Sequence, residues 1–300
     1  SIAQKLYEKG LITYMRTDST NLSKEAQAQI VAEVAQKYGN EYAVARVYKT
    51  KSKNAQEAHE AIRPTHAGNM SAGTADDEKK LYKLIWARAV ASQMSDAKIL
   101  RTKISANIES KTIPNFSANG GRTIFPGWLK ADPEAAGEDV ELPKVSIGEP
   151  LKLIELNSEE KATEPPARYT EAGLIKELEK RDIGRPSTYA SIMKTLVDRG
   201  YVERVNRTLF PTDTGDVVIT FLEKNFSNYI SDSFTAEMED ELDDISNGKR
   251  DYGKTLKDFY IPFAKDVKSK EKIEKLTTLG DGPDGVMCPK CGSGMIIKLG

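Results

Sequence analysis

The residues that could do chemistry gather near the amino terminus, in residues 10–19. Arg16 follows Tyr14 two positions later, and Asp18 lies four positions after it. A phenol has a pKa of about 10, so it is a weak nucleophile near neutral pH. A neighbouring cation favours the phenolate and would also stabilise charge on a phosphoryl group under attack. The pattern therefore allows covalent catalysis at phosphate, and the alternative is a loop tyrosine hydrogen-bonded to Asp18.

Three segments together carry a family resemblance. They are GLITYMRTDSTNLS at residues 10–23, QEAHEAIRP at residues 56–64 and IGRPSTYA at residues 183–190. The first resembles the active-site segment of the type IA DNA topoisomerases, and the other two fit the same family in the same order. The resemblance runs from residue 1 to at least residue 262. Three ordered segments are much more specific than any one of them alone.

The resemblance implies a mechanism and a set of site residues. Tyr14 would attack a phosphodiester of single-stranded DNA and form a 5′-phosphotyrosyl bond, which is later reversed without ATP. Arg16 would stabilise the pentavalent phosphate, and His59 would hydrogen-bond the scissile phosphate or its neighbour. Thr13 and Asp18 would support these three residues from behind. The implied outcome is relaxation of negatively supercoiled DNA.

The resemblance also implies a partner domain that we do not find in these residues. The family needs an amino-terminal Toprim domain, whose glutamate and Asp-x-Asp pair bind Mg²⁺. The chain opens at Ser1 without an initiator methionine. We therefore expect a central and carboxyl-terminal core fragment of a longer enzyme. We expect it to bind single-stranded DNA without cleaving it alone.

His59 and Glu60 have ordinary structural alternatives. We predict a short helix over residues 55–62, on which His59 lies opposite Ile62 and could face a site. The alternative for His59 is a surface histidine. Glu60 could tune the pKa of His59 or pair with Arg63, but simple solvation on the helix surface is the favoured interpretation.

Composition bounds the class of protein. The chain has 300 residues, of which 39% are hydrophobic and 30% charged, with a net charge of −1. It contains no apolar run of about 18 residues and no signal-like start, so a membrane span is not predicted. Near-zero net charge argues mildly against a nucleic-acid binder, although basic residues outnumber acidic ones over residues 181–207. We expect a cytoplasmic, nucleoid-associated monomer.

Periodicity predicts a mainly α, α+β multidomain chain. Residues 1–98 form a helical domain with Tyr14, residues 99–158 a β-rich segment, residues 159–275 a winged-helix-like domain, and residues 276–300 a linker with the first half of a zinc ribbon. By resemblance, the β-rich segment is part of an arch.

Local signals predict individual elements. Ser23 caps a helix that Gly39 ends, and Thr74 starts a longer helix. Alternation over residues 100–108 predicts a strand. Residues 119–121 predict a turn between two strand-like runs. Residues 151–156 predict another strand.

Residues 170–211 show a helix-turn-helix and hairpin pattern. Thr170 precedes one helix, residues 182–186 form a turn, and Ser187 caps a second helix that Gly200 ends. Residues 201–205 and 208–211 then predict a hairpin. This is a winged helix-turn-helix pattern, which also fits a transcriptional regulator that binds DNA. That alternative leaves the Tyr14 and His59 segments unexplained.

The start of the second predicted helix is a candidate phosphate site. A helix amino terminus offers free N–H groups and a positive dipole. Arg185 adds charge, and Ser187 and Thr188 add hydroxyl donors. By resemblance, single-stranded DNA is gripped here, and Arg168 and Tyr169 would join. Ordinary capping is the alternative, and Tyr169 could equally belong to the core.

Two other motifs are weaker. Residues 248–255 match the P-loop pattern, but a helix is predicted where a buried strand should precede it, so we do not favour an ATPase. Cys288 and Cys291 have the spacing of a zinc knuckle, yet a structural site needs four ligands and the chain has no other cysteine. We expect half of a zinc ribbon, without metal in this chain. Nothing indicates a secreted disulfide framework.

Overall fold

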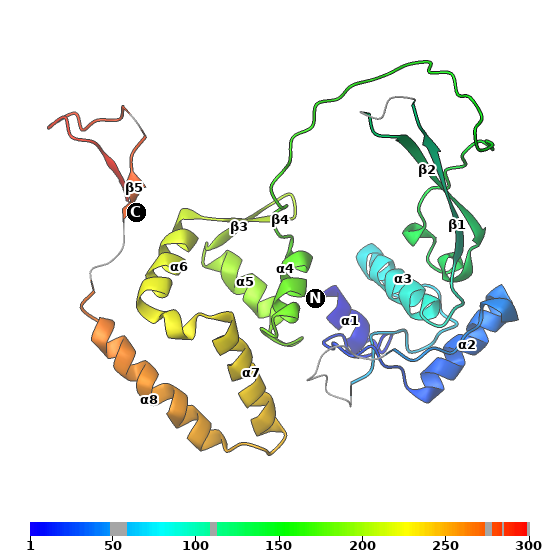
Figure 1. Cartoon of the computed structure of the whole chain (residues 1–300). Helices are drawn as coiled ribbons and strands as arrows, with labels where there is room; N and C mark the ends of the chain where they lie inside the picture. The colour runs from blue at the N-terminus through cyan, green and yellow to red at the C-terminus, as the bar shows by residue number, and fades with distance from the viewer. Residues whose placement is uncertain (49–58, 109–112, 274–277, 284, 299–300) are drawn as a thin grey trace. The chain divides into compact units, whose positions relative to one another are not determined.

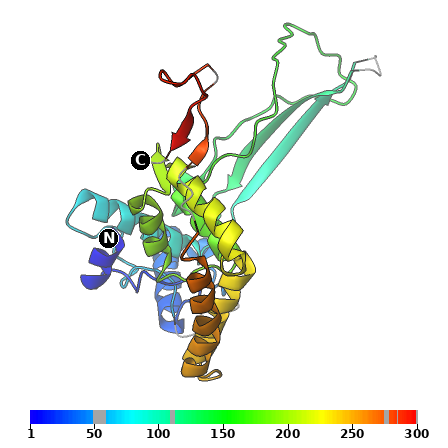
Figure 2. The same cartoon turned by 90° about the vertical axis from the view of Figure 1, so that its left-hand side faces the viewer.

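The structure is a computed structural model that describes residues 1–48, 59–108, 113–273, 278–283 and 285–298. It divides into two compact units, residues 1–162 and 163–300 (Figures 1 and 2). The described residues are mostly helical, and their strands pair into small two-stranded antiparallel sheets. The predicted α+β, mainly α class is confirmed at this level. The four-part division of the chain stays a prediction.

The first unit opens with three α-helices and one 3₁₀ turn. Their bounds are α1 Ile2–Glu8, α2 Lys24–Tyr38, η1 Asn40–Tyr42 and α3 Asp76–Ala91. As predicted, the Ser23 side chain caps α2 by accepting a hydrogen bond from the Ala26 N–H at 3.2 Å, and α2 ends at Gly39.

The predicted start of α3 at Thr74 is wrong. The N-cap is Ala75, which makes no side-chain capping bond. The Thr74 N–H and hydroxyl instead donate to Glu78 at 2.9 and 3.1 Å, and Lys9 donates to the same carboxylate at 2.7 Å. The Lys9 ammonium, with help from Thr74, lowers the pKa of Glu78 to about 2. These contacts join the end of α1 to the start of α3.

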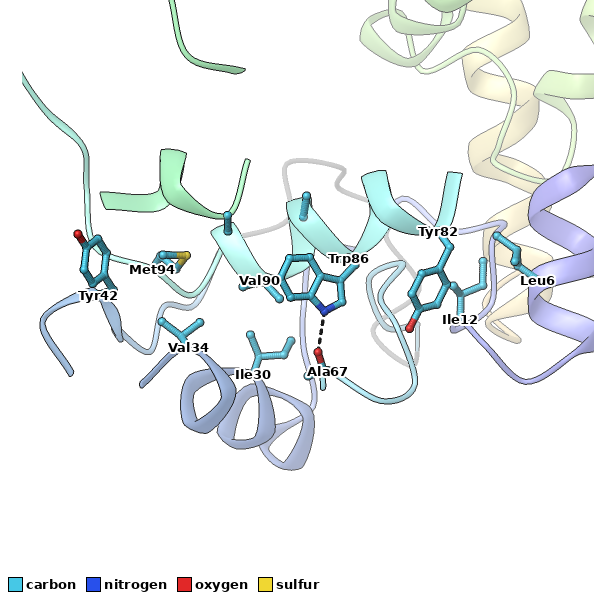
Figure 3. Close-up of a cluster of buried hydrophobic side chains, with 12 residues drawn as sticks. Leu6, Ile12, Ile30, Val34, Tyr42, Ala67, Tyr82, Trp86, Val90 and Met94 are labelled. Carbon is cyan, nitrogen blue, oxygen red and sulfur yellow. Dashed lines mark hydrogen bonds between the residues drawn. The ribbon is translucent and has the colours of Figure 1, made fainter. Parts of the chain in front are cut away.

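One hydrophobic cluster holds this unit together. In Figure 3, side chains of α1, α2 and α3 meet those of the intervening loops, and the Trp86 Nε1–H donates to the Ala67 carbonyl at 2.6 Å. Leu6 and Ile12 belong to the cluster and are 0% and 1% exposed. Because burial of a large aliphatic side chain stabilises a fold by about 1.5–3 kcal/mol, this packing fixes the backbone on both sides of residue 10.

A long hairpin follows the helices. It pairs β1 Lys98–Ala106 with β2 Phe116–Phe125 and leads into η2 Gly127–Lys130 and η3 Pro133–Ala135. The predicted strand at residues 100–108 is confirmed in its larger part. The predicted turn at residues 119–121 is wrong, since these residues lie within β2.

Close packing, and not a turn, explains why position 120 is a glycine. A Cβ added there would lie 2.5 Å from the Val140 carbonyl oxygen, because the chain passes closely beside the strand. The predicted strand at residues 151–156 is also wrong, because these residues have no regular structure. A strand needs a hydrogen-bonded neighbour, and none of the described strands pairs with this segment.

The second unit contains five α-helices, a 3₁₀ turn and two hairpins within its described residues. Their bounds are α4 Glu171–Lys180, α5 Tyr189–Asp198, β3 Val202–Val205, β4 Thr208–Pro211, α6 Asp213–Phe226, η4 Ser227–Tyr229, α7 Asp232–Ser246, α8 Tyr252–Lys270, β5 Thr278–Asp281 and β6 Ile296–Lys298.

Local predictions largely hold in the helix and hairpin part of this unit. Thr170 caps α4 through the Gly173 N–H at 3.1 Å. The β3–β4 hairpin has the predicted tip, where Asn206 and Arg207 have φ of +47° and +69°. Positive φ at both central residues is what a tight two-residue hairpin requires. The predicted Ser187 cap is wrong, since α5 begins at Tyr189 with Thr188 as its N-cap.

The P-loop pattern lies in a helical setting. Helix α7 ends at Ser246 and α8 begins at Tyr252, so the stretch 248–255 consists of a helix–helix turn and the first residues of α8, without the preceding strand that a P-loop needs. The ATPase alternative therefore has no structural support. Within the described ranges, no helix is both long and apolar enough to cross a membrane.

Candidate active site

Tyr14 follows directly on a backbone clamp between two distant segments. Ile12 and Pro64 form an antiparallel bridge, and the Thr13 N–H donates to the Arg63 carbonyl at 2.9 Å. The Thr13 hydroxyl donates to the Ala61 carbonyl at 2.7 Å and accepts from the Arg63 N–H at 2.9 Å. The clamp thus fixes the segment of Tyr14 against the segment of His59.

Two rings flank the Tyr14 side chain. The Tyr7 ring lies edge-on with a centroid separation of 5.3 Å, and the His59 ring lies at 6.2 Å. Tyr14 is 40% exposed, so its phenol is accessible from solvent. The predicted pairing of Tyr14 and His59 in space is present. Tyr7 was not predicted, because nothing in its sequence neighbourhood distinguishes it from another helix tyrosine.

The backbone at His59 differs from the prediction. Residues 59–62 are not helical, and residues 55–58 lie outside the described ranges. Instead of the hydrogen bonds of a helix, this segment makes the bonds of the Thr13 clamp and a bond from the Ala61 N–H to the Asn21 carbonyl at 2.7 Å. His59 is half-buried and reaches Tyr14 from this extended segment.

Arg16 and Asp18 lie just beyond the tyrosine. Arg16 is exposed, and no ion pair or hydrogen bond joins its side chain to a residue in the described ranges. The alternative hydrogen bond between Tyr14 and Asp18 does not occur among the described contacts. The site therefore presents an exposed phenol beside an imidazole, with an exposed guanidinium two residues on that pairs with none of the described residues.

Glu60 is a structural acid, and the favoured prediction that it is simply solvated is wrong. Its carboxylate accepts from the Arg63 Nε at 2.8 Å and Nη2 at 2.9 Å, and from the Ser23 N–H at 2.8 Å. Burial by itself raises the pKa of Glu60, but hydrogen bonds from Arg63 and Ser23 outweigh it and lower the pKa. Glu60, which directly follows His59 in the chain, thereby joins this segment to Ser23 at the start of α2.

The candidate phosphate site of the second unit is organised differently. The Arg185 guanidinium donates to Asp243 at 2.9 Å and to Asp240 at 3.4 Å, both on α7. Burial alone would lower the pKa of Arg185, but these carboxylates raise it. The Thr188 hydroxyl accepts from the Arg185 N–H at 2.8 Å. Ser187 is exposed.

Arg168 and Tyr169 lie against the hairpin of the same unit. The Arg168 guanidinium stacks over the Phe210 ring at 5.0 Å, and the Tyr169 carbonyl accepts from the Leu209 N–H at 2.8 Å. With the Thr170–Thr208 bridge, this segment runs along β4 like a short third strand. Tyr169 is 48% exposed, so its ring is not part of the core.

The cysteine pair forms a tight turn. The Cys288 N–H donates to the Ser293 carbonyl at 2.8 Å, and the Gly292 N–H donates to the Cys288 carbonyl at 2.9 Å. Hydrogen bonds from Ser293, with a further one from Cys288, lower the pKa of the Cys291 thiol. Across the described ranges, no three His, Cys, Asp or Glu side chains group closely enough to hold a metal ion. The residues present therefore do not complete a four-ligand zinc site.

Comparisons with known proteins agree with this geometry. The family described as DNA topoisomerase matches residues 1–257, and the chain belongs to this family. DNA topoisomerase 1 of Vibrio cholerae is 43% identical over 99% of the chain and 34% of its own length. DNA topoisomerase 1 of Synechococcus elongatus is 48% identical over 86% of the chain and 30% of its own length.

A solved structure extends the comparison to the fold. Full-length topoisomerase I from Thermotoga maritima matches with a TM-score of 0.74 and 35% identity, covering 100% of this chain and 50% of that one. The chain thus spans about a third of the length of the curated relatives named above. Family membership gives no support to the transcriptional-regulator alternative.

Proposed function

We propose that this chain carries the strand-cleaving tyrosine of a type IA DNA topoisomerase. The Tyr14 phenolic oxygen attacks a phosphodiester of single-stranded DNA. The phenol gives up its proton, a bond forms between its oxygen and phosphorus, the bond from phosphorus to the 3′-oxygen breaks, and the 3′-oxygen takes up a proton. After strand passage, the 3′-hydroxyl reverses the attack and releases Tyr14. Because the phosphotyrosyl bond conserves the energy of the phosphodiester, relaxation of negatively supercoiled DNA needs no ATP.

The observation that carries the proposal is the exposed Tyr14 phenol held beside His59, two residues before Arg16, whose side chain is exposed and pairs with none of the described residues. Arg16 stabilises negative charge on the phosphoryl oxygens as phosphorus becomes five-coordinate. His59 hydrogen-bonds a non-bridging oxygen of the same phosphate or of its neighbour. Thr13 acts indirectly by holding the two segments together, and we assign Asp18 the supporting role that the family resemblance implies.

Single-stranded DNA is the proposed partner of both units. In the second unit, the proposed contacts are Arg168, Tyr169, Arg185, Ser187 and Thr188. The arrangement of α4, α5 and the β3–β4 hairpin supports a winged-helix-like assignment. The β1–β2 hairpin supports an arch segment, and the Cys288–Cys291 turn supports the first half of a zinc ribbon. We propose a monomer that works in the cytoplasm at the nucleoid.

Mg²⁺ enters through the family resemblance, in which it is bound by carboxylates of a Toprim domain and assists charge neutralisation at phosphate. The described residues of this chain do not group into such a ligand set. We therefore derive no step through the metal. We expect the 300-residue chain by itself to bind single-stranded DNA without cleaving it, and cleavage by these residues alone would contradict that expectation.

The test uses a complete topoisomerase that contains this chain. The enzyme is incubated with Mg²⁺ and 5′- or 3′-end-labelled single-stranded DNA and trapped with denaturant. We expect a covalent adduct in which Tyr14 is joined to the 5′ phosphate of one DNA segment. The adduct should therefore carry the 3′-end label, and the 5′-end label should leave with the other segment. The adduct should vanish in Tyr14→Phe and persist in Tyr260→Phe, a control at an exposed tyrosine of α8. An adduct that survives Tyr14→Phe would refute the assignment of the nucleophile.

A further inference from the structure

The first unit contains a cavity that the proposed chemistry does not use. It has a volume of about 450 Å³, within the range of about 300–1,000 Å³ that ligand pockets usually have. Its lining includes Ser19, Arg46, Tyr48, Ile62 and Trp128. The cavity is therefore bordered by residues that follow Tyr14 and His59 closely in the chain.

Two walls continue the clamp of the active site. The Ala61 N–H donates to the Asn21 carbonyl at 2.7 Å, which holds the segment after Tyr14 against the segment after His59. Ser19 and Leu22 line the cavity on the first segment, and Ile62 lines it on the second. The cavity is therefore lined by residues that lie only a few positions after Tyr14 and His59, so a DNA strand bound at Tyr14 has the cavity close by.

The third wall includes Arg46 and Tyr48, from a segment that is hydrogen-bonded to the end of α3 and the residues just after it. The Arg46 N–H donates to the buried Gln93 side chain at 2.8 Å, and the Arg46 carbonyl accepts from the Gln93 amide at 3.1 Å. The Tyr48 hydroxyl donates to the Ser92 carbonyl at 2.8 Å. These bonds hold the Tyr48 ring in place along the end of α3. Trp128 also borders the cavity, and its backbone N–H donates to the Ser95 carbonyl at 2.9 Å.

The charges of the cavity favour a neutral, planar ligand. Arg46 pairs with Asp96 at 2.9 Å, and Arg88 pairs with Asp132 at 3.5 Å, so the cations bordering the cavity are balanced by carboxylates. The buried Arg46 Nε–H has no hydrogen-bond partner in the described structure. The Arg46 side chain as a whole is 31% exposed and its Asp96 partner 78% exposed, so the cavity offers this ion pair beside the aromatic side chains of Tyr48 and Trp128.

We propose that this cavity binds one unpaired base of the DNA strand held at Tyr14. The proposal rests on the proposed function and adds a base subsite to it. The base stacks on Tyr48 in the cavity that Trp128 also borders, and its polar edge meets the exposed part of the Arg46–Asp96 ion pair. Stacking on an aromatic side chain is available to every base because each has a π-face, whereas the polar edge can distinguish bases. A phosphate alone would meet balanced charges and gain little.

The test compares two octamers of single-stranded DNA with the 300-residue chain. One octamer has a fixed sequence, and the other has the same backbone without bases. We expect the base-bearing octamer to bind more tightly. In Tyr48→Ala, the ratio of the two affinities should fall about 5- to 150-fold, the range expected for losing one base–aromatic stack. Tyr48→Phe should keep the ratio, and so should Tyr260→Ala, an exposed tyrosine control.

A second measurement needs no variant. The chain has two tryptophans, and Trp86 is 2% exposed in the core whereas Trp128 borders the cavity. The base-bearing octamer should quench tryptophan fluorescence, and the octamer without bases should not. Equal binding and equal fluorescence with both octamers would overturn the base subsite and leave the proposed cleavage function intact. Binding of neither octamer would overturn both the subsite and single-strand binding by this chain, while the adduct assay would still decide the nucleophile.

Discussion

The two units use a similar pair of residues in opposite ways. In the first unit, Thr13 holds the backbone and leaves Arg16 exposed, without an ion pair in the described ranges. In the second unit, Thr188 caps its own turn while Arg185 is held by carboxylates of α7. An arginine beside a hydroxyl residue can therefore form an open cationic site or a closed structural contact. What decides between them is a carboxylate supplied by a distant part of the chain.

The largest effect is expected from removing the open cation. In the complete enzyme, Arg16→Ala should lower the cleavage rate by about 10²–10³-fold, because a preorganised cation at the transferring phosphate is lost. Affinity for single-stranded DNA should change much less. Single-turnover cleavage of labelled DNA measures the rate, with Arg101→Ala as an exposed arginine control. Equal loss of rate and affinity would mean that Arg16 binds DNA without acting on the transition state.

A smaller effect is expected from opening the clamp. Thr13→Val should lower the free energy of unfolding by about 1–3 kcal/mol, because the Ala61 carbonyl and the Arg63 N–H lose a partner. Urea unfolding of the 300-residue chain measures this change. Thr13→Ser should restore most of it, and Thr102→Val on the exposed face of β1 should cost little. Full stability in Thr13→Val would show that the backbone bonds of the clamp suffice without the hydroxyl.

Opening the closed arginine site should give a gain of a few-fold. Asp243→Asn removes the carboxylate nearest Arg185, so the affinity for single-stranded DNA should rise about two- to fivefold, the size of one partly exposed ion pair. Asp244→Asn makes the same change of charge on α7 without touching that pair and serves as the control. The gain should disappear when Arg185→Ala is added. A gain that persists in the double variant would assign it to general charge instead of to Arg185.

The smallest effect is a pH dependence of the first unit. The pKa of Glu60 is lowered in the folded chain by Arg63 and Ser23, against the effect of burial. The carboxylate therefore stabilises the fold above the unfolded pKa of about 4.3, and this stability is lost as pH falls through the lower folded pKa. Glu60→Gln should flatten the curve of unfolding free energy against pH in that acid range. Glu155→Gln, in an exposed irregular segment, should not.

Local chemistry made parts of the fold predictable. Ser23 caps a helix as predicted, and Thr170 caps the helix that was predicted to follow it, because a hydroxyl bond to an N–H three residues later depends on nearby residues alone. The hairpin tip at residues 206–207 was predictable for the same reason. Strand prediction failed at residues 151–156, because alternation cannot show whether a neighbouring strand exists. Glycines at residues 120–121 indicated a turn, whereas Gly120 instead leaves room for the Val140 carbonyl beside the strand.

The site was less predictable than the elements that carry it. Motif resemblance brought Tyr14, Arg16 and His59 together, and the structure does place the two rings side by side. The clamp from Thr13 to residues 61–63 and the pairing of Glu60 with Arg63 depend on contacts that no local pattern encodes. Likewise, Arg185 and its α7 carboxylates are far apart in sequence. The sequence therefore suggested an Arg185 side chain open to phosphate, whereas in the structure it pairs with these carboxylates.

The Arg185 pair has a consequence for the salt dependence of DNA binding. A free arginine that meets a phosphate releases a condensed counterion from DNA, and the logarithm of affinity then falls steeply with the logarithm of salt concentration. Arg185 would instead trade one anion for another, because Asp243 must be displaced and takes up a counterion of its own. Each such exchange of partners contributes little to the slope of log affinity against log salt concentration. The second unit should therefore hold DNA with a weaker dependence on ionic strength than its arginines suggest.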